Sequence, residues 1–223
     1  MVRIIVPGKA ESSDRIIKAT NSQTSIPQAS LRATDKVHRD IEEYLEPFGL
    51  FYDRRKNMHK NEGRLTEQII GIPLIAQAIM SISMQRPDDA RARPSSLLKR
   101  DDDYAKIFSP EHPIELYLVA GKLIKAVQSY LRAREELQPK DKNNLLFYVA
   151  MYAVSKLTGK AHPSTKDLAK IKPEDIQLAV IEESVKTVQA DYAALGASDL
   201  VAKGTGLLAR LKERLEKEYP PGK

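Results

Sequence analysis

The chain has 223 residues and no cysteine, which excludes disulfide bonds, thiolate metal sites and cysteine nucleophiles. Hydrophobic residues make up 42% and charged residues 30% of it, a balance typical of a globular protein and not of a disordered one. The formal net charge of +6 favours contact with polyanions, nucleic acid first, although many proteins carry such an excess and bind nothing with it.

Targeting signals are absent from the opening residues, which lack the basic, apolar and small-residue order of a secretory leader. We therefore expect a cytoplasmic protein. The most apolar stretch, Ile69 to Met84, is short for a bilayer span and is interrupted by Pro73, Gln77 and Ser81. This pattern predicts a buried helix and no contact with a membrane.

The first quarter of the chain contains the strand candidates. Val2 to Val6 is a β-branched run closed by Pro7 and Gly8, and it reads as a strand. Its partner is either a second short strand at Leu50 to Asp53 or sequence outside this chain. Between the two, Asp35 begins a helix that runs to about Leu45 and is stopped by Pro47 and Gly49.

Helical patterns occupy most of the remainder. The spacing predicts a long helix from Leu65 to about Met84, kinked at Pro73. Residues 85–100 are rich in proline and charge, so we expect a loop or short helical turns there and a flexible connection. Two further helices are predicted over residues 113–137 and 145–157, the second ended by Gly159.

A last helix is expected to begin near Pro173, a residue suited to a first helical turn. Apolar residues follow it at steps of three and four over residues 178–215, interrupted at Gly196, which fits two antiparallel helices of a small bundle. The same seam offers an alternative function, because it could join the chain to a protein partner or to a second copy. The seam consists of Leu178, Ile181, Val185, Val188, Tyr192, Leu195, Leu208, Leu211 and Leu215.

The fold class that follows is mainly α: a helical bundle with a small strand-containing N-terminal part. We expect a small α/β part over residues 1–62, continuing a domain upstream, and a helical domain over residues 63–223.

Motifs that carry chemistry are lacking in this sequence. The four histidines have no metal-ligand spacing, no phosphate loop surrounds Gly204 and Gly206, and no nucleophile elbow surrounds a serine. The acidic run Asp101 to Asp103 could ligate a divalent ion, but a solvated first helical turn is the preferred interpretation. We predict no catalytic residue, no metal and no cofactor.

A basic run follows the predicted strand at Leu50 to Asp53. It consists of Arg54, Arg55, Lys56, His59 and Lys60, and it is preceded by the aromatic residues Phe51 and Tyr52. Aromatic rings can stack on bases while basic side chains hold phosphates, so this mixture suits single-stranded nucleic acid. The alternative is an exposed basic turn with Phe51 in the core. A second polar segment, Thr20 to Thr24, either organises a turn or reads a nucleic acid.

Two segments of the sequence together resemble the AIPR family, the abortive-infection phage-resistance proteins of bacteria. They are IIKATNSQTSIPQASLRATD, from Ile16 to Asp35, and FGLFYDRRKN, from Phe48 to Asn57. The chain departs from the family pattern at Asp53, where members often carry glutamate. The close likeness covers roughly the first quarter of the chain.

The resemblance implies a phage-defence role and a longer protein, of which this chain would be the C-terminal portion. Any nuclease-like region would then lie upstream. We therefore expect a non-catalytic module that binds nucleic acid or a protein partner. The alternatives are a structural or oligomerisation module, and a fragment whose Asp53 and acidic triplet complete a nuclease site formed by upstream sequence. The predicted nucleic-acid-binding residues are Asn21, Gln23, Tyr52, Arg54, Arg55, Lys56 and Lys60.

Overall fold

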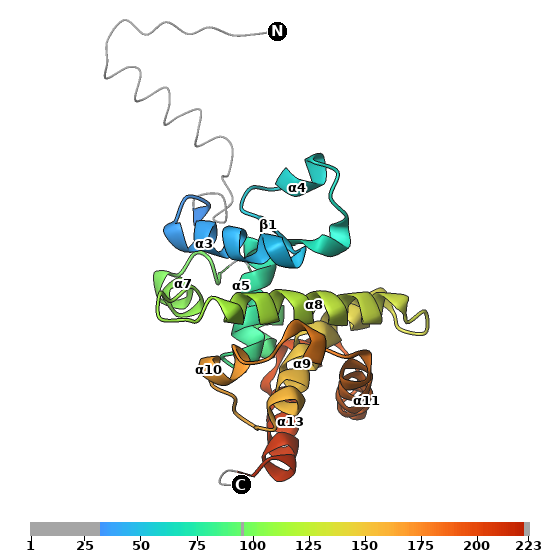
Figure 1. Ribbon diagram of the computed structural model, residues 1–223. Coiled ribbons are helices and arrows are strands. Elements are labelled where there is room, and N and C mark those ends of the chain that lie inside the picture. Colours follow the sequence, from blue (N-terminus) through green and yellow to red (C-terminus); the bar gives the residue numbers. More distant parts are fainter. Residues whose placement is uncertain (1–31, 95, 221–223) are drawn as a thin grey trace, which may run out of the picture.

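The computed structural model describes residues 32–94 and 96–220, and in these ranges the chain is mainly α-helical with one two-stranded sheet (Figure 1). The predicted fold class is confirmed. In chain order the elements are α3 (Lys36–Leu45), η1 (Glu46–Phe48), β1 (Phe51–Asp53), α4 (Met58–Asn61), η2 (Thr66–Gln68), β2 (Ile69–Gly71), α5 (Ile72–Ile82), α6 (Pro87–Ala92), α7 (Asp101–Ile107), α8 (Glu115–Ala133), α9 (Pro139–Thr158), α10 (Thr165–Leu168), η3 (Pro173–Asp175), α11 (Leu178–Ala194), α12 (Asp199–Lys203) and α13 (Thr205–Glu218).

The sheet pairs β1 with β2 in parallel, with Tyr52 opposite Ile70. The connection between them carries α4, so the sheet spans the predicted boundary at residue 62. The expected strand at Val2 to Val6 lies outside the described residues.

The prediction of a single long helix from Leu65 to Met84 is wrong. That segment forms η2, then β2, and only then α5, which begins at Ile72. Pro73 lies in the first turn of α5, where its missing N–H leaves no hydrogen bond unmade, so it starts a helix instead of kinking one.

Helix α3 begins and ends as the sequence predicted, at Lys36 and Leu45. Asp35 occupies the N-cap position, but its side chain accepts a hydrogen bond from the Tyr104 hydroxyl at 2.6 Å and makes no capping bond. After η1, Gly49 takes φ +67°, the left-handed conformation that favours glycine, and turns the chain into β1.

The core is built around α9, in which every side chain from Asn144 to Ser155 is buried. Helices α5, α6, α8 and α11 all contact it, and in Figure 1 α8 crosses the middle of the molecule with α9 and α11 below it. Buried residues from Ala33 to Leu215 belong to one hydrophobic cluster. None of the helices in the described ranges is long and apolar enough to cross a membrane.

The proline- and charge-rich segment at residues 85–100 contains α6, which contacts α5 and α9. The Gln77 side chain donates to the Ala90 carbonyl at 2.8 Å, and the Gln85 side chain donates to the Ala161 carbonyl at 2.6 Å. Asp89 is 7% exposed and bonds both Arg86 and Arg93. The two glutamine bonds tie the segment to the helical body, and the Asp89 pairs stabilise it internally.

Most of the apolar seam over residues 178–215 is buried by packing against other helices of the same chain. Ile181, Val185, Val188 and Tyr192 are at most 2% exposed, and α11 lies against α9. Helix α13 is joined to α11 through Asp191, which accepts hydrogen bonds from Arg210 at 2.7 Å and from Arg214 at 2.9 Å. Two seam residues stay exposed, Leu178 at 63% and Leu195 at 38%.

The first prediction tests this assignment of the seam. Val188→Asp would place a charge where the side chain is 0% exposed, so we expect a loss of more than about 4 kcal/mol of unfolding free energy. The matched variant Leu178→Asp, at the exposed start of the same helix, should change stability by no more than about 0.5 kcal/mol. Urea unfolding followed by circular dichroism measures both. A Val188→Asp protein that keeps its stability and only turns a dimer into a monomer would contradict the assignment.

Candidate nucleic-acid interface

The basic run lies on a lobe formed by the end of β1, α4 and the turns that flank it, at the edge of the molecule in Figure 1. Asp53 organises this lobe, because its carboxylate accepts the backbone N–H of His59 at 2.9 Å. Asn57 then takes φ 64°, a left-handed conformation that asparagine adopts more readily than most residues. The turn that results leaves Arg55 and Lys56 exposed to solvent, and Lys60 is exposed on α4.

Arg54 is committed to partners within the chain. Its Nε lies 2.7 Å from a carboxylate oxygen of Glu42, and one of its terminal nitrogens donates to the Ala33 carbonyl at 3.0 Å. The side chain is about 25% exposed. It therefore fastens α3 to the end of β1, and its removal would disturb the lobe that it supports.

Tyr52 lies in the core with 0% exposure, so its ring cannot stack on a base, and this corrects the prediction that included it. The cause is the short strand β1, in which both Phe51 and Tyr52 are buried. Phe51 is 8% exposed and covered by Arg64, whose guanidinium carbon lies 4.1 Å from the ring centroid. Neither aromatic ring is presented to solvent as a stacking platform.

The other predicted residues divide into two groups. Arg55, Lys56 and Lys60 are exposed, and within the described ranges none of them forms a salt bridge. Asn21 and Gln23 lie outside the described residues, so their proximity to the basic run stays a prediction.

Two arginines outside the predicted set lie close to the basic run. Arg64 is exposed and lies three residues after the end of α4, so the basic run in the sequence extends slightly beyond Lys60. Arg39 on α3 lines the same hollow as Arg54 and His59, and only the packing of α3 beside β1 places it there. We call Arg55, Lys56, Lys60 and Arg64 the basic lobe.

Beneath the lobe, His38 links two elements through a chain of hydrogen bonds. Tyr104 donates to Asp35, so its oxygen is free to accept from His38 Nε2 at 3.0 Å. His38 Nδ1 then accepts from the Tyr52 hydroxyl at 2.9 Å. With a neutral ring, His38 completes this series of hydrogen bonds. Burial lowers the pKa of His38 to about 4; the charges of Arg54 and Arg32 act in the same direction, and that of Asp35 opposes them.

The second prediction follows from this depressed pKa. Because the folded protein holds His38 neutral, the stabilisation is complete above the unfolded pKa of about 6.5 and is lost as the pH falls towards 4. The loss should reach about 3 kcal/mol relative to His38→Gln, whose side chain does not titrate. Urea unfolding of both proteins between pH 7 and 5 measures the onset. Parallel stability curves for the two proteins would contradict it.

The acidic residues considered for a nuclease site are engaged separately. Asp53 supports the α4 turn, while Asp101 pairs with Arg32 and Asp103 lies 3.4 Å from Arg100. The acidic triplet lies in the first turn of α7, as predicted. Across residues 32–94 and 96–220, no group of three or more His, Asp or Glu side chains is placed to hold a metal ion.

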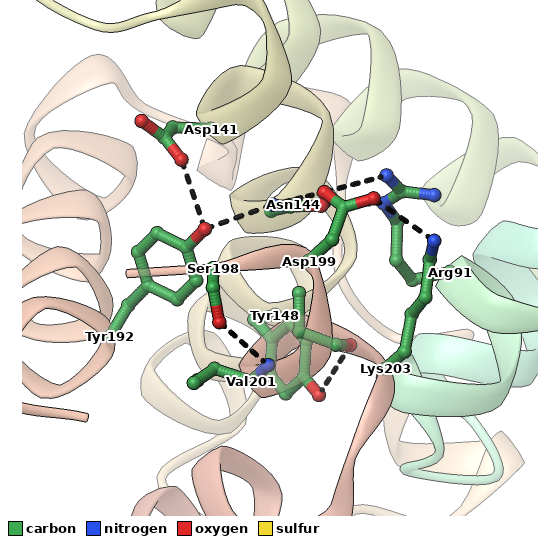
Figure 2. A network of polar contacts seen from close by, with 10 residues as sticks. Arg91, Asp141, Asn144, Tyr148, Tyr192, Ser198, Asp199, Val201 and Lys203 are labelled. Carbon is green, nitrogen blue, oxygen red and sulfur yellow. Dashed lines mark hydrogen bonds and ion pairs between the residues drawn. The ribbon is translucent and has the colours of Figure 1, made fainter. Parts of the chain in front are cut away.

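A cluster of polar side chains lies elsewhere, around Asn144 on α9. Figure 2 shows Arg91, Tyr192 and Asp199 converging on it from α6, α11 and α12. The Asn144 amide oxygen accepts from Arg91 at 2.8 Å, and its nitrogen donates to the Tyr192 hydroxyl at 2.9 Å and to Asp199 at 3.0 Å. Tyr192 donates onward to Asp141 at 2.9 Å. The bonding capacity of Asn144 is used within the chain, so the cluster is a junction of helices.

The third prediction concerns this junction. Asn144→Ala should lower the unfolding free energy by about 2–4 kcal/mol, because it removes the hydrogen bonds that a fully buried amide makes to three other helices and leaves the buried Tyr192 hydroxyl without its donor. Lys203→Ala removes only a partly exposed ion pair with Asp199, and should lower it by less than about 1 kcal/mol. Thermal and urea unfolding compare the two. Equal effects would show that Asn144 does not join the helices.

Comparison with known protein families matches residues 1–197 to the family model described as AIPR protein. This confirms the resemblance seen in the two N-terminal segments, and it extends the likeness through α11, stopping before α12 and α13. The comparison with curated proteins gave no significant match, and neither did the comparison with solved structures.

Proposed function

Since the chain belongs to the AIPR family, we propose that it is a non-catalytic, nucleic-acid-binding module of an abortive-infection-type phage-defence protein. Family membership suggests the defence role. The binding function is our own inference from the basic lobe, and it assigns no reaction to this chain.

The observation that carries the proposal is a group of cations held out from the body of the protein. Some basic side chains are neutralised within the chain, such as Arg54 by Glu42 and Arg210 by Asp191. Arg55, Lys56 and Lys60 have no such partner among the described residues. They lie within six residues of one another, in the turn before α4 and in α4 itself. Unpaired, solvated cations of this kind are available to phosphates at little cost in desolvation.

The form of binding follows from what the lobe lacks. Phe51 and Tyr52 are buried, so base stacking does not contribute, and the contacts are electrostatic contacts to the backbone. Such contacts carry little sequence information and weaken steeply as salt rises. The proposed module therefore holds or positions a nucleic acid and does not read a particular sequence.

The alternative of an oligomerisation module is less favoured by the packing. Most of its seam is enclosed between α11, α9 and α13. A protein partner stays compatible with family membership.

The fourth prediction tests the basic lobe. The variant Arg55→Ala/Lys56→Ala/Lys60→Ala should stay folded, because all three side chains are exposed, and should lose at least about tenfold in affinity for a labelled single-stranded oligonucleotide at low salt. If all three contact phosphates, the slope of log affinity against log salt should fall by about 2. Fluorescence anisotropy at several salt concentrations, with DNA, RNA and duplex probes, measures both quantities.

A matched control removes the same charge elsewhere. Lys166, Lys170 and Lys186 are exposed on and beside α10 and on α11, and no salt bridge is formed by them within the described ranges. Their triple alanine variant should bind within about twofold of the unmodified chain, if binding depends on the lobe and not on net charge. Equal losses in the two variants, or no measurable binding by the unmodified chain, would defeat the proposal.

A further inference from the structure

A largely apolar groove runs along the side of α3, where this helix and η1 face the turn that leads into α8. Its volume is about 760 Å³. Helix α3 supplies Val37 and Tyr44, η1 supplies Phe48, and the facing turn supplies Pro110 and Ile114. It belongs neither to the basic lobe nor to the Asn144 junction.

Phe48 gives the groove an exposed aromatic wall. It is 42% exposed, the ring centroids of Tyr44 and Phe48 lie 5.5 Å apart, and Val37 and Tyr44 are two helical turns apart on the same face of α3. Tyr44 is partly buried, and Phe48 beside it is exposed. An exposed aromatic ring in an apolar groove is typical of surfaces that bind another molecule, since it would gain by leaving water.

Charge around the groove is acidic, against the sign of the whole chain. Glu43 lines the groove. Burial raises the pKa of Tyr44, and the nearby charge of Glu115 raises it further. Both glutamates are exposed, and in the part of the chain that the structure describes neither forms a salt bridge.

The nearby basic groups offset this acidic rim only in part. Lys36 is paired with Asp40 at 2.6 Å. The Lys122 ammonium donates to the neutral Phe48 carbonyl at 2.6 Å and keeps its charge, so one lysine stands against Glu43 and Glu115. His112 also lines the groove, and burial lowers its pKa, so it adds no positive charge near neutral pH. An occupant of matching chemistry is apolar on one face and cationic beside it.

We propose that this groove binds a short amphipathic helix of a protein partner, with apolar side chains against Tyr44 and Phe48 and lysine or arginine beside Glu43 and Glu115. Apolar anchors at helical spacing laid into a groove are a recurrent mode of peptide recognition. The ten residues of α3 span about 15 Å, so the matching segment has about three turns. This surface is independent of the nucleic-acid proposal.

Selection from a displayed library of random peptides of about 16 residues tests the proposal, since that length accommodates the expected helix. Peptides retained by the unmodified chain and not by Phe48→Asp are collected, and the leading one is measured by fluorescence anisotropy. We expect apolar residues at helical spacing together with an excess of lysine and arginine. The charge-reversal variant Glu43→Lys/Glu115→Lys should weaken the leading peptide by at least about tenfold.

The control is Leu200→Asp, which alters an apolar side chain that is 84% exposed on α12, and it should bind the leading peptide within about twofold of the unmodified chain. Oligonucleotide binding by Phe48→Asp should be unchanged, which separates this surface from the basic lobe. The proposal is overturned if no peptide is enriched, if enriched peptides lack a basic excess, or if charge reversal leaves their affinity unchanged. A dimer that Phe48→Asp dissociates in sedimentation would instead assign the groove to a second copy of the chain.

Discussion

The arrangement of this protein depends on the burial of α9 from Asn144 to Ser155. A helix that is apolar around its whole circumference has no side that can face water, so other elements must enclose it. Helices α5, α6, α8 and α11 enclose it, and the apolar stripe of α11 is buried against α9 as a result. The two polar residues in the buried stretch, Asn144 and Ser155, persist there because each finds hydrogen-bond partners on neighbouring segments.

Enclosure of α9 also explains why polar contacts gather where they do. Several helices end or cross near Asn144, and an amide with both donors and an acceptor can bond three of them at once. Loss of hydrogen bonding is costly in such a place, because water cannot replace the missing partner. The cluster in Figure 2 therefore fixes how α6, α11 and α12 meet α9.

Around this body, α3 separates two surfaces of different character. Near β1 it contributes Arg39 and the Glu42 that anchors Arg54, and the basic lobe projects beyond them. Towards α8 it contributes Val37 and Tyr44 to a groove bordered by carboxylates. A net charge of +6 thus says little about either surface, because the field that a ligand meets depends on the charges within a Debye length of it.

The sequence by itself determined the mainly α fold, the limits of α3, the strand at Phe51 and the stop of α9 at Gly159, because periodicity and helix-ending residues act over a few neighbouring positions. It also determined the family, through the two N-terminal segments. It misjudged residues 65–84, since the apolar run at Ile69 to Ile72 suits strand or helix alike, and only pairing with β1 decides between them.

Tertiary structure alone decided the fate of the candidate site residues. Arg54 and Arg55 are adjacent and chemically identical, yet the first is held by Glu42, twelve residues away in the chain, while the second faces water. Tyr52 was taken for a surface ring and is buried beside His38. The groove beside Phe48 joins segments more than sixty residues apart. Burial and ion pairing depend on neighbours brought together by folding, and local sequence does not specify which neighbours those are.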